Sequence, residues 1–225
     1  MAENNYYLSR KKHLLRSFDR ASRRIVASLV NRYDKEFSSV VVEKARKEYE
    51  ALVPQIPFIG GAKNRWTADL IESVQILALF RAMSAYGKPL SETADVLYEG
   101  MQIRLAQYPR FLLRLMGRLQ FSRLFLNRLQ REANETQKQV YPDDFVAEIV
   151  MGDGKEFDWG IDFTECAIHK FYKAQNAVEL LPYVCKLDYL TSTAFGLGLV
   201  RTKTLASGDE KCNPRLKQGR DTKWN

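Results

Sequence analysis

Three short couplets in the last third of the chain set a cysteine three residues from a group that can exchange a proton or bind a metal. They contain all three cysteines of the protein and are Cys166-x-x-His169, Cys185-x-x-Asp188 and Asp209-x-x-Cys212. On a helix, this spacing puts both side chains on one face. A lone free cysteine is more often a small apolar filler of the core than a reactive group. Because every cysteine here has a polar partner, the couplets indicate a functional site.

A metal site is one chemistry that these residues could support. Thiolate, imidazole and carboxylate groups are the usual ligands of zinc, and a water molecule on the metal would be the nucleophile. The alternative zinc ligands are Cys166, His169, Cys185, Asp188 and Cys212. None of the couplets has the Cys-x-x-Cys or His-x-x-x-His spacing, so we expect no metal and no other cofactor, with zinc as the alternative.

Length and composition narrow the class of protein. A chain of 225 residues with an apolar fraction of 45% can bury the core of one generous domain, or of two small ones. No apolar run is long enough to span a bilayer, and the polar stretch Met1 to Lys12 lacks the apolar core of a secretion signal. Three cysteines make an odd and sparse set, as is usual for reduced thiols. We therefore expect a soluble, cytoplasmic protein.

The net charge of +8 is concentrated in one segment. Seven arginines lie between Arg104 and Arg131, interleaved with leucine and phenylalanine. The commonest structure with this pattern is a core-packing helix whose outer face is solvated arginine. A basic amphipathic helix can also lie on an anionic membrane, so the segment Arg110 to Arg131 makes a membrane surface an alternative partner. The chain has no zinc-finger spacing, RNP aromatics or phosphate-binding glycine loop, and we expect no nucleic-acid partner.

The elements that must position the couplets change character along the chain. Apolar periodicity predicts helices in the first two thirds, from Leu14 to Leu29, Phe37 to Leu52, Thr67 as N-cap to Tyr86, Ser91 to about Tyr108, and Arg110 to about Gln139 with a break near Gly117. At Asp144 the period changes to that of a strand. The predicted strands are Phe145 to Met151, Phe157 to Thr164, Leu197 to Leu205 and about Lys211 to Leu216.

Short helices are expected between these strands, from Ala167 to Lys173 and from Pro182 to Tyr189. Asn176 and Glu179 resemble a capping box. In the second strand, Phe157, Trp159, Ile161 and Phe163 alternate with polar residues and are expected to face the core. The predicted fold class is α+β, a helical N-terminal two thirds followed by a small antiparallel sheet with interleaved helices. We expect one compact domain with a helical region, 1–143, and an α+β region, 144–225.

Over about Leu52 to Arg215 the chain resembles the L-2-amino-thiazoline-4-carboxylic acid hydrolase family. The segments that carry the resemblance are Pro57-Phe-Ile-Gly60-Gly61, Cys185-Lys-Leu-Asp188 and Arg201-Thr-Lys-Thr204-Leu-Ala-Ser-Gly208-Asp209-Glu-Lys-Cys212. The family usually has Asp and an aromatic residue after the last cysteine, whereas this chain has Asn213-Pro214. The resemblance implies hydrolytic opening of a small cyclic amidine-like acid at a carbon–nitrogen or carbon–sulfur bond.

Such a reaction needs a nucleophile at the amidine carbon, a proton for the leaving atom and donors for a carboxylate. Cys185 could be the nucleophile, because a thiolate attacks readily once a neighbour lowers its pKa from about 8.5. A carboxylate beside a thiol raises that pKa instead, so Asp188 is better assigned as a base that activates water or as an acceptor for the amidine. The predicted catalytic group is Cys185, Asp188, Cys212 and His169, and the predicted substrate-binding group is Thr204, Asp209, Arg201, Cys166, Gly60 and Gly61.

The alternative function is a non-catalytic module that binds or senses a small ligand. A helical half that covers a small antiparallel sheet could hold such a ligand, with the cysteines lining its site or responding to oxidation. Both functions take a small molecule as partner. Both also depend on the couplets lying close together, so the spatial relation of Cys166, Cys185 and Cys212 is the first question for the structure.

Overall fold

The computed structural model describes residues 5–224, so the first four residues of the polar N-terminal stretch lie outside it. The described residues group into two compact units, of which one takes in residues up to 104 together with 171–184 and the other takes in 105–170 and those from 185 onward. This division does not follow the change of period at Asp144. It also passes through three helices, and neither unit is a single continuous stretch of chain.

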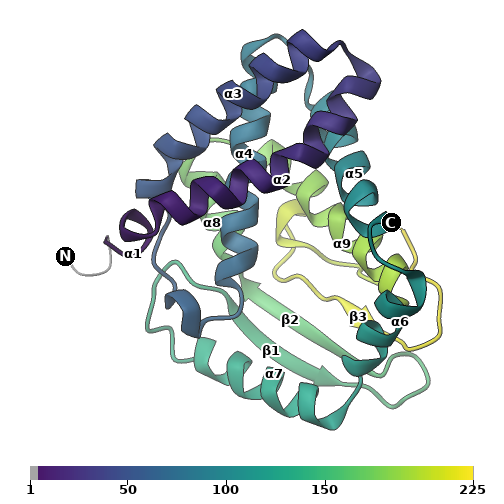
Figure 1. The fold of residues 1–225 in the computed structure, drawn as a ribbon. Helices are drawn as coiled ribbons and strands as arrows, with labels where there is room; N and C mark the ends of the chain where they lie inside the picture. The colour runs from purple at the N-terminus through teal and green to yellow at the C-terminus, as the bar shows by residue number, and fades with distance from the viewer. Residues whose placement is uncertain (1–4, 225) are drawn as a thin grey trace. The chain divides into compact units, whose positions relative to one another are not determined.

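The first unit is built from helices (Figure 1). They are α1 (Asn5–Ser9), α2 (Lys11–Arg32), α3 (Lys35–Leu52), α4 (Thr67–Ala85) and most of α5 (Leu90–Ala106), with short 3-10 turns η1 (Val53–Gln55) and η2 (Gly61–Lys63). The predicted apolar stripes of α2 and α3 are buried, and the rings of Phe18 and Tyr49 stack with their centroids 5.2 Å apart. Trp66 precedes α4 as its N-cap, so the prediction that Thr67 caps this helix is wrong by one residue.

The loop Pro57 to Gly61 lies in the first unit. Gly60 has a φ of 105° and Gly61 a φ of 58°, in the left-handed region that glycine adopts without strain. At Gly61 a Cβ atom would also stand 2.6 Å from the ring of Tyr6. The local backbone and the close approach of this ring account for both glycines.

The second unit holds a three-stranded sheet and helices around it (Figure 1). Its elements are α6 (Arg110–Leu119), α7 (Arg123–Thr136), β1 (Val146–Met151), β2 (Trp159–Glu165), the first part of α8 (Ala167–Ala174), most of α9 (Leu181–Phe195), the 3-10 turn η4 (Leu205–Ser207) and β3 (Arg215–Leu216). The strands pair antiparallel in the order β1-β2-β3, with Ile149 opposite Ile161 and Trp159 opposite Leu216. The predicted α+β class is confirmed.

Helix α7 runs beside β1, and hydrogen bonds fix the end of one to the other (Figure 1). Thr136 Oγ1 accepts from the backbone N–H of Ala147 at 2.9 Å, and the side chain of Gln137 donates to the Ala147 carbonyl at 2.7 Å. On β2, Trp159 is buried as predicted, while Ile161 and Phe163 are only partly buried. On the polar face of β2, Asp162 accepts hydrogen bonds from Lys211 and Arg215, which neutralise its negative charge.

The predicted strand Leu197 to Leu205 does not form. Only Val200 makes a bridge, opposite Arg215. The backbone N–H groups of Thr202 and Lys203 donate instead to the side-chain oxygen of Asn213, at 3.0 and 2.8 Å. A side-chain acceptor thereby replaces a neighbouring strand. The predicted capping box at Asn176 is also wrong, because this residue has a φ of 52° and is followed by a 3-10 turn, η3 (Val178–Leu180).

The predicted break near Gly117 lies slightly later, where Ser122 caps α7 by accepting from the backbone N–H of Phe125. Gly117 is inside α6 for another reason. A Cβ atom there would stand 2.0 Å from the carbonyl oxygen of Phe195, at the end of α9. Glycine thus allows the backbones of α6 and α9 to approach closely.

Gly117→Ala is expected to lower the free energy of unfolding by about 2 kcal/mol, because a backbone atom cannot move aside as a flexible side chain can. Chemical denaturation of the two proteins measures the difference. Gly100→Ala is the control, because a Cβ atom at this helical glycine would meet only the end of the flexible Ile25 side chain. Equal stability of the Gly117→Ala protein and the wild type would contradict the close approach of α6 and α9.

Among residues 5–224, no helix is both long enough and apolar enough to cross a membrane. The three cysteines are free thiols.

Candidate active site

Helix α9 carries Cys185 and Asp188 one turn apart, as their spacing predicts. Pro182 stands in its first turn, where the missing N–H costs no helical hydrogen bond. Arg201, which follows the bridge at Val200, contacts both positions. Its guanidinium donates to Asp188 Oδ2 at 2.9 Å and to the Cys185 carbonyl oxygen at 2.6 Å. The residue is only 6% exposed, so these two contacts hold a buried cation against α9.

An aromatic pair supports Arg201 from another side. The guanidinium carbon lies 5.0 Å from the centre of the Tyr189 ring, a cation–π contact. Trp224 stacks on the same ring, with centroids 5.2 Å apart and an angle of 25° between the planes. No local pattern indicates a role for Tyr189 or Trp224, because their contacts join positions 12 or more residues apart in the chain. A stacked pair of large rings restricts the movement of the buried arginine.

Asp188 is accessible and poorly solvated at once. Its side chain is 64% exposed, yet desolvation raises the pKa of its carboxyl group above the ordinary value, against the opposing charge and hydrogen bond of Arg201. A group in this position can be reached by a small molecule and holds its proton more tightly than a surface aspartate.

The pKa shifts of the two partners favour different protonation states of the pair. Burial alone would lower the pKa of Arg201, but the nearby Asp188 and Cys185 outweigh it and raise the pKa. A raised pKa favours the charged guanidinium, whereas the raised pKa of Asp188 favours the neutral acid. Arginine stays protonated at every physiological pH. The pair therefore titrates at the carboxyl group of Asp188.

Cys166 lies between β2 and α8 rather than on the strand. Its sulfur accepts hydrogen bonds from the backbone N–H groups of His169 and Ile168, at the start of α8. These bonds lower its pKa, but desolvation dominates and raises the value to about 12. His169 therefore interacts with the Cys166 sulfur through its backbone N–H group. Its predicted part in proton transfer stays a prediction.

The three thiols, Asp188 and Arg201 act on one another electrostatically. Desolvation raises the pKa of Cys185 to about 12, and Arg201 lowers it while Asp188, Cys166 and Cys212 raise it further. Cys212 also has a raised pKa, through desolvation first, with Arg201 lowering it and Asp188 raising it. Such mutual effects require proximity, because the interaction of two charges falls with distance. The three cysteines, Asp188 and Arg201 therefore lie within electrostatic range of one another in the second unit, and they are here called the Asp188 cluster.

Cys212 is fixed in the cluster through its backbone and its sulfur. It exchanges two hydrogen bonds of 2.9 Å with Phe163 of β2. Its Sγ accepts from the backbone N–H of Leu205 at 3.2 Å. The strand β2 and the loop around η4 together determine where this thiol lies.

Thr204 and Asp209 shape the same loop. The Asp209 carboxylate accepts from the backbone N–H of Thr204 at 2.7 Å, and Thr204 Oγ1 accepts from the backbone N–H of Ser207 at 3.1 Å. Both residues were predicted to bind substrate, and the contacts that the structure shows for them are internal to the loop. They close the turn that returns the chain to Cys212.

Asn213 closes the base of this loop and was not predicted to do so. Besides accepting from Thr202 and Lys203, its side chain donates to Thr202 Oγ1 at 2.8 Å. An aspartate has the same acceptor oxygen as the one that Asn213 uses for the two backbone groups. Asn213 departs from the aspartate that the family usually has after the last cysteine. It nevertheless keeps the hydrogen-bond acceptor that the backbone of this loop needs.

Within the described part of the chain, no group of three or more His, Cys, Asp or Glu side chains is arranged to hold a metal ion. Gly60 and Gly61 belong to the first unit, where their conformation explains them, and a role in substrate binding stays a prediction.

An α+β protein in which a buried arginine pairs with an exposed aspartate near three thiols is compatible with several kinds of small-molecule enzyme. Comparison with protein families decides between them, because a model of the family described as L-2-amino-thiazoline-4-carboxylic acid hydrolase matches residues 68–216. The chain belongs to this family, and the family resemblance predicted from the sequence is confirmed. The match includes all three couplets and begins after the loop Pro57 to Gly61. Searches of curated proteins and of solved structures found no match.

Proposed function

We propose that the protein hydrolyses a small cyclic amidine-like acid, opening its ring at a carbon–nitrogen or carbon–sulfur bond, with Asp188 as the base. Family membership supports a hydrolase. The observation that carries the proposal is Asp188 itself, a carboxylate that small molecules can reach, with a raised pKa and a buried arginine to orient it. A base whose pKa approaches the working pH is effective in proton transfer.

In this mechanism a water molecule attacks the amidine carbon of the substrate and transfers a proton to Asp188. The tetrahedral intermediate then collapses with cleavage of the ring bond to nitrogen or sulfur. The leaving atom takes up a proton, and Asp188 returns to its ionised form when it gives the proton up. The amidine N–H groups are suitable donors to the carboxylate oxygen that Arg201 does not use.

The cysteines enter this mechanism as neutral thiols. With a pKa of about 12, Cys185 is ionised at pH 7 in only about one molecule in 10⁵. A covalent mechanism would have to generate the thiolate in a cluster that disfavours it. Cys166 and Cys212 also have raised pKa values, so the three thiols supply weak hydrogen bonds and a poorly solvated surface beside Asp188.

Arg201 is better assigned as a positioning residue than as the predicted donor to the substrate's carboxylate. Two of its guanidinium nitrogens donate hydrogen bonds, one to the Asp188 carboxylate and the other to the Cys185 carbonyl oxygen. These contacts fix the orientation of the base. We propose that no metal takes part, that the substrate is a small molecule, and that the protein works in the cytoplasm, where thiols stay reduced.

The experiment that tests the proposal is turnover of 2-aminothiazoline-4-carboxylate and related cyclic amidines by the wild type and by Cys185→Ser. Because a hydroxyl replaces a neutral thiol, turnover is expected to fall by less than about tenfold. Cys166→Ser serves as the matched thiol control, and activity is expected to survive a chelator. Loss of activity to background in Cys185→Ser alone, with protection by substrate against alkylation of that thiol in the wild type, would establish a covalent mechanism instead. Tight binding of these compounds without turnover would favour the ligand-binding module.

A further inference from the structure

The helix α6 and the start of α7 expose a set of large apolar side chains, here called the α6 face. Its members are Phe111 (75% exposed), Leu112, Leu115, Met116, Leu119 and Leu124 (85% exposed). Scattered exposed leucines are normal on a protein surface, but a contiguous set of this size marks an interaction site. The first five recur on one side of α6, as helical spacing requires.

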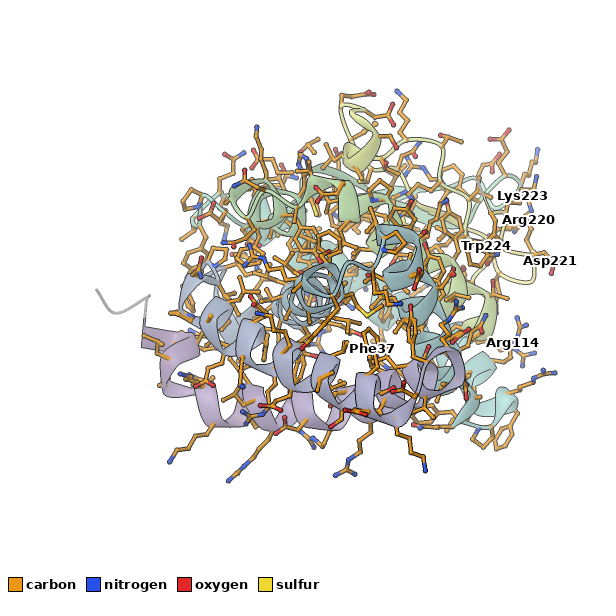
Figure 2. All side chains as sticks on the ribbon, turned by 90° about the horizontal axis from the view of Figure 1, so that it is seen from above. Phe37, Arg114, Arg220, Asp221, Lys223 and Trp224 are labelled. Carbon is orange, nitrogen blue, oxygen red and sulfur yellow. The ribbon has the colours of Figure 1, made fainter. Side chains whose placement is uncertain are left out.

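Charge borders this apolar face in an ordered way. Around α6, the buried residues Leu113 and Gly117 form one stripe, and Arg110, Arg114 and Arg118 form the next, four residues apart. The apolar residues occupy the remaining, outward part of the helix. Figure 2 shows Arg114 on the same side of the view as Arg220, Asp221 and Lys223, which belong to the same unit.

The segment around α6 carries positive charge alone. From Gly100 to Arg131 the chain contains seven arginines and neither aspartate nor glutamate, and two of these arginines pair with acids outside the segment, Arg104 with Glu72 and Arg128 with Glu132. Any surface that covers the α6 face must therefore supply negative charge at its border and an apolar interior. A symmetric contact with a second copy would set these arginines against the same arginines of the other chain, without acids in the segment to pair with them.

We propose that the α6 face docks on the surface of an anionic membrane. The apolar side chains enter the boundary between headgroups and acyl chains, and the bordering arginines pair with lipid phosphates and acidic headgroups. This is the arrangement of interfacial helices that lie in the plane of a bilayer without crossing it. The proposal concerns a surface outside the Asp188 cluster and does not depend on the proposed hydrolase reaction.

Sedimentation of the full chain with lipid vesicles tests this inference. The protein is expected to pellet with vesicles of equal parts phosphatidylcholine and phosphatidylglycerol, and not with phosphatidylcholine alone. Raising the salt concentration should release it, because the electrostatic attraction is screened. Phe111→Ser combined with Leu115→Ser should weaken binding by about tenfold or more, since two exposed apolar side chains are lost.

Charge variants separate the α6 face from the net charge of the chain. Arg110→Gln combined with Arg118→Gln should weaken binding to anionic vesicles by about fivefold for each arginine. Lys12→Gln combined with Arg16→Gln removes the same charge from exposed positions of α2 and should leave binding within about twofold. Melting curves show whether each variant is folded. The two charge variants keep every apolar residue and test the proposal even if the serine variant melts early.

Three results would overturn the proposal. The first is failure of the wild type to bind anionic vesicles at low salt. The second is equal weakening by the α2 control, which would assign binding to net charge. The third is a dimer in sedimentation velocity that the Phe111→Ser, Leu115→Ser variant abolishes, in the absence of vesicle binding, because the α6 face would then join two copies.

Discussion

Asp188→Asn is expected to lower turnover of a cyclic amidine by about a thousandfold, within the range that removal of a general base produces. The amide keeps an oxygen that can accept the hydrogen bond from Arg201, so the geometry of α9 is retained. It cannot take a proton from water. Steady-state kinetics of the purified variant measures the effect, with kcat expected to fall more than KM rises.

The matched control is Asp143→Asn, the same chemical change at an exposed aspartate of the second unit. This variant should keep full activity. If Asp188→Asn also keeps full activity, Asp188 is not the base. If both variants lose activity and their melting curves also lose the cooperative unfolding transition, the loss of activity comes from a failure to fold.

The pH dependence of the wild type provides a second readout of the same group. Because desolvation raises the pKa of Asp188, its carboxyl group keeps a proton to higher pH than free aspartic acid, whose pKa is about 3.9. The base is active only when ionised, so kcat/KM should rise with pH through a transition above that value. An acidic limb at or below the ordinary aspartate pKa would show that a different group sets it.

Arg201→Met is expected to lower the free energy of unfolding by about 3 kcal/mol. The substitution removes the donor to the Cys185 carbonyl and leaves Asp188 without its counter-ion. Because Asp188 still reaches solvent, the loss of stability should lie at the lower end of the range that is typical for breaking a buried ion pair. For a protein of this length, the melting temperature should fall by about 10 °C.

Two further variants separate charge from packing at this position. Arg201→Lys keeps the charge but cannot make both planar contacts, so its stability should be intermediate. Arg110→Met makes the same substitution at an exposed arginine and should melt within about 2 °C of the wild type. An unchanged melting temperature in Arg201→Met would contradict the structural role assigned to the Arg201–Asp188 pair.

The local elements that carry the site could be predicted from the sequence. Pro182 marked the start of a helix, and the spacing of Cys185 and Asp188 put both on one face of it. Alternation from Phe157 to Phe163 likewise predicted β2. These features depend on residues within about two turns of one another, where helical and strand periodicity contain the information.

The contacts that complete the cluster could not be predicted in the same way. Arg201 was selected as a donor to substrate, because no local pattern indicates that it pairs with Asp188. Asn213 was noted only as a departure from the family pattern, although its side chain decides that residues after Val200 form a loop instead of a strand. Long-range pairings of this kind follow from tertiary packing, which a single sequence does not encode in any regular spacing.

The interleaving of the two units along the chain limits how the protein can be dissected. Residues 171–184 belong with the first unit, although they are flanked on both sides by segments of the second. A single cut at residue 143 would therefore leave each fragment without a part of its own packing, and neither is an independent folding unit. The helices up to Arg104 are grouped with a segment that begins almost 70 residues further along the chain. Closing so long a loop favours folding after the chain is complete, over assembly of one unit at a time.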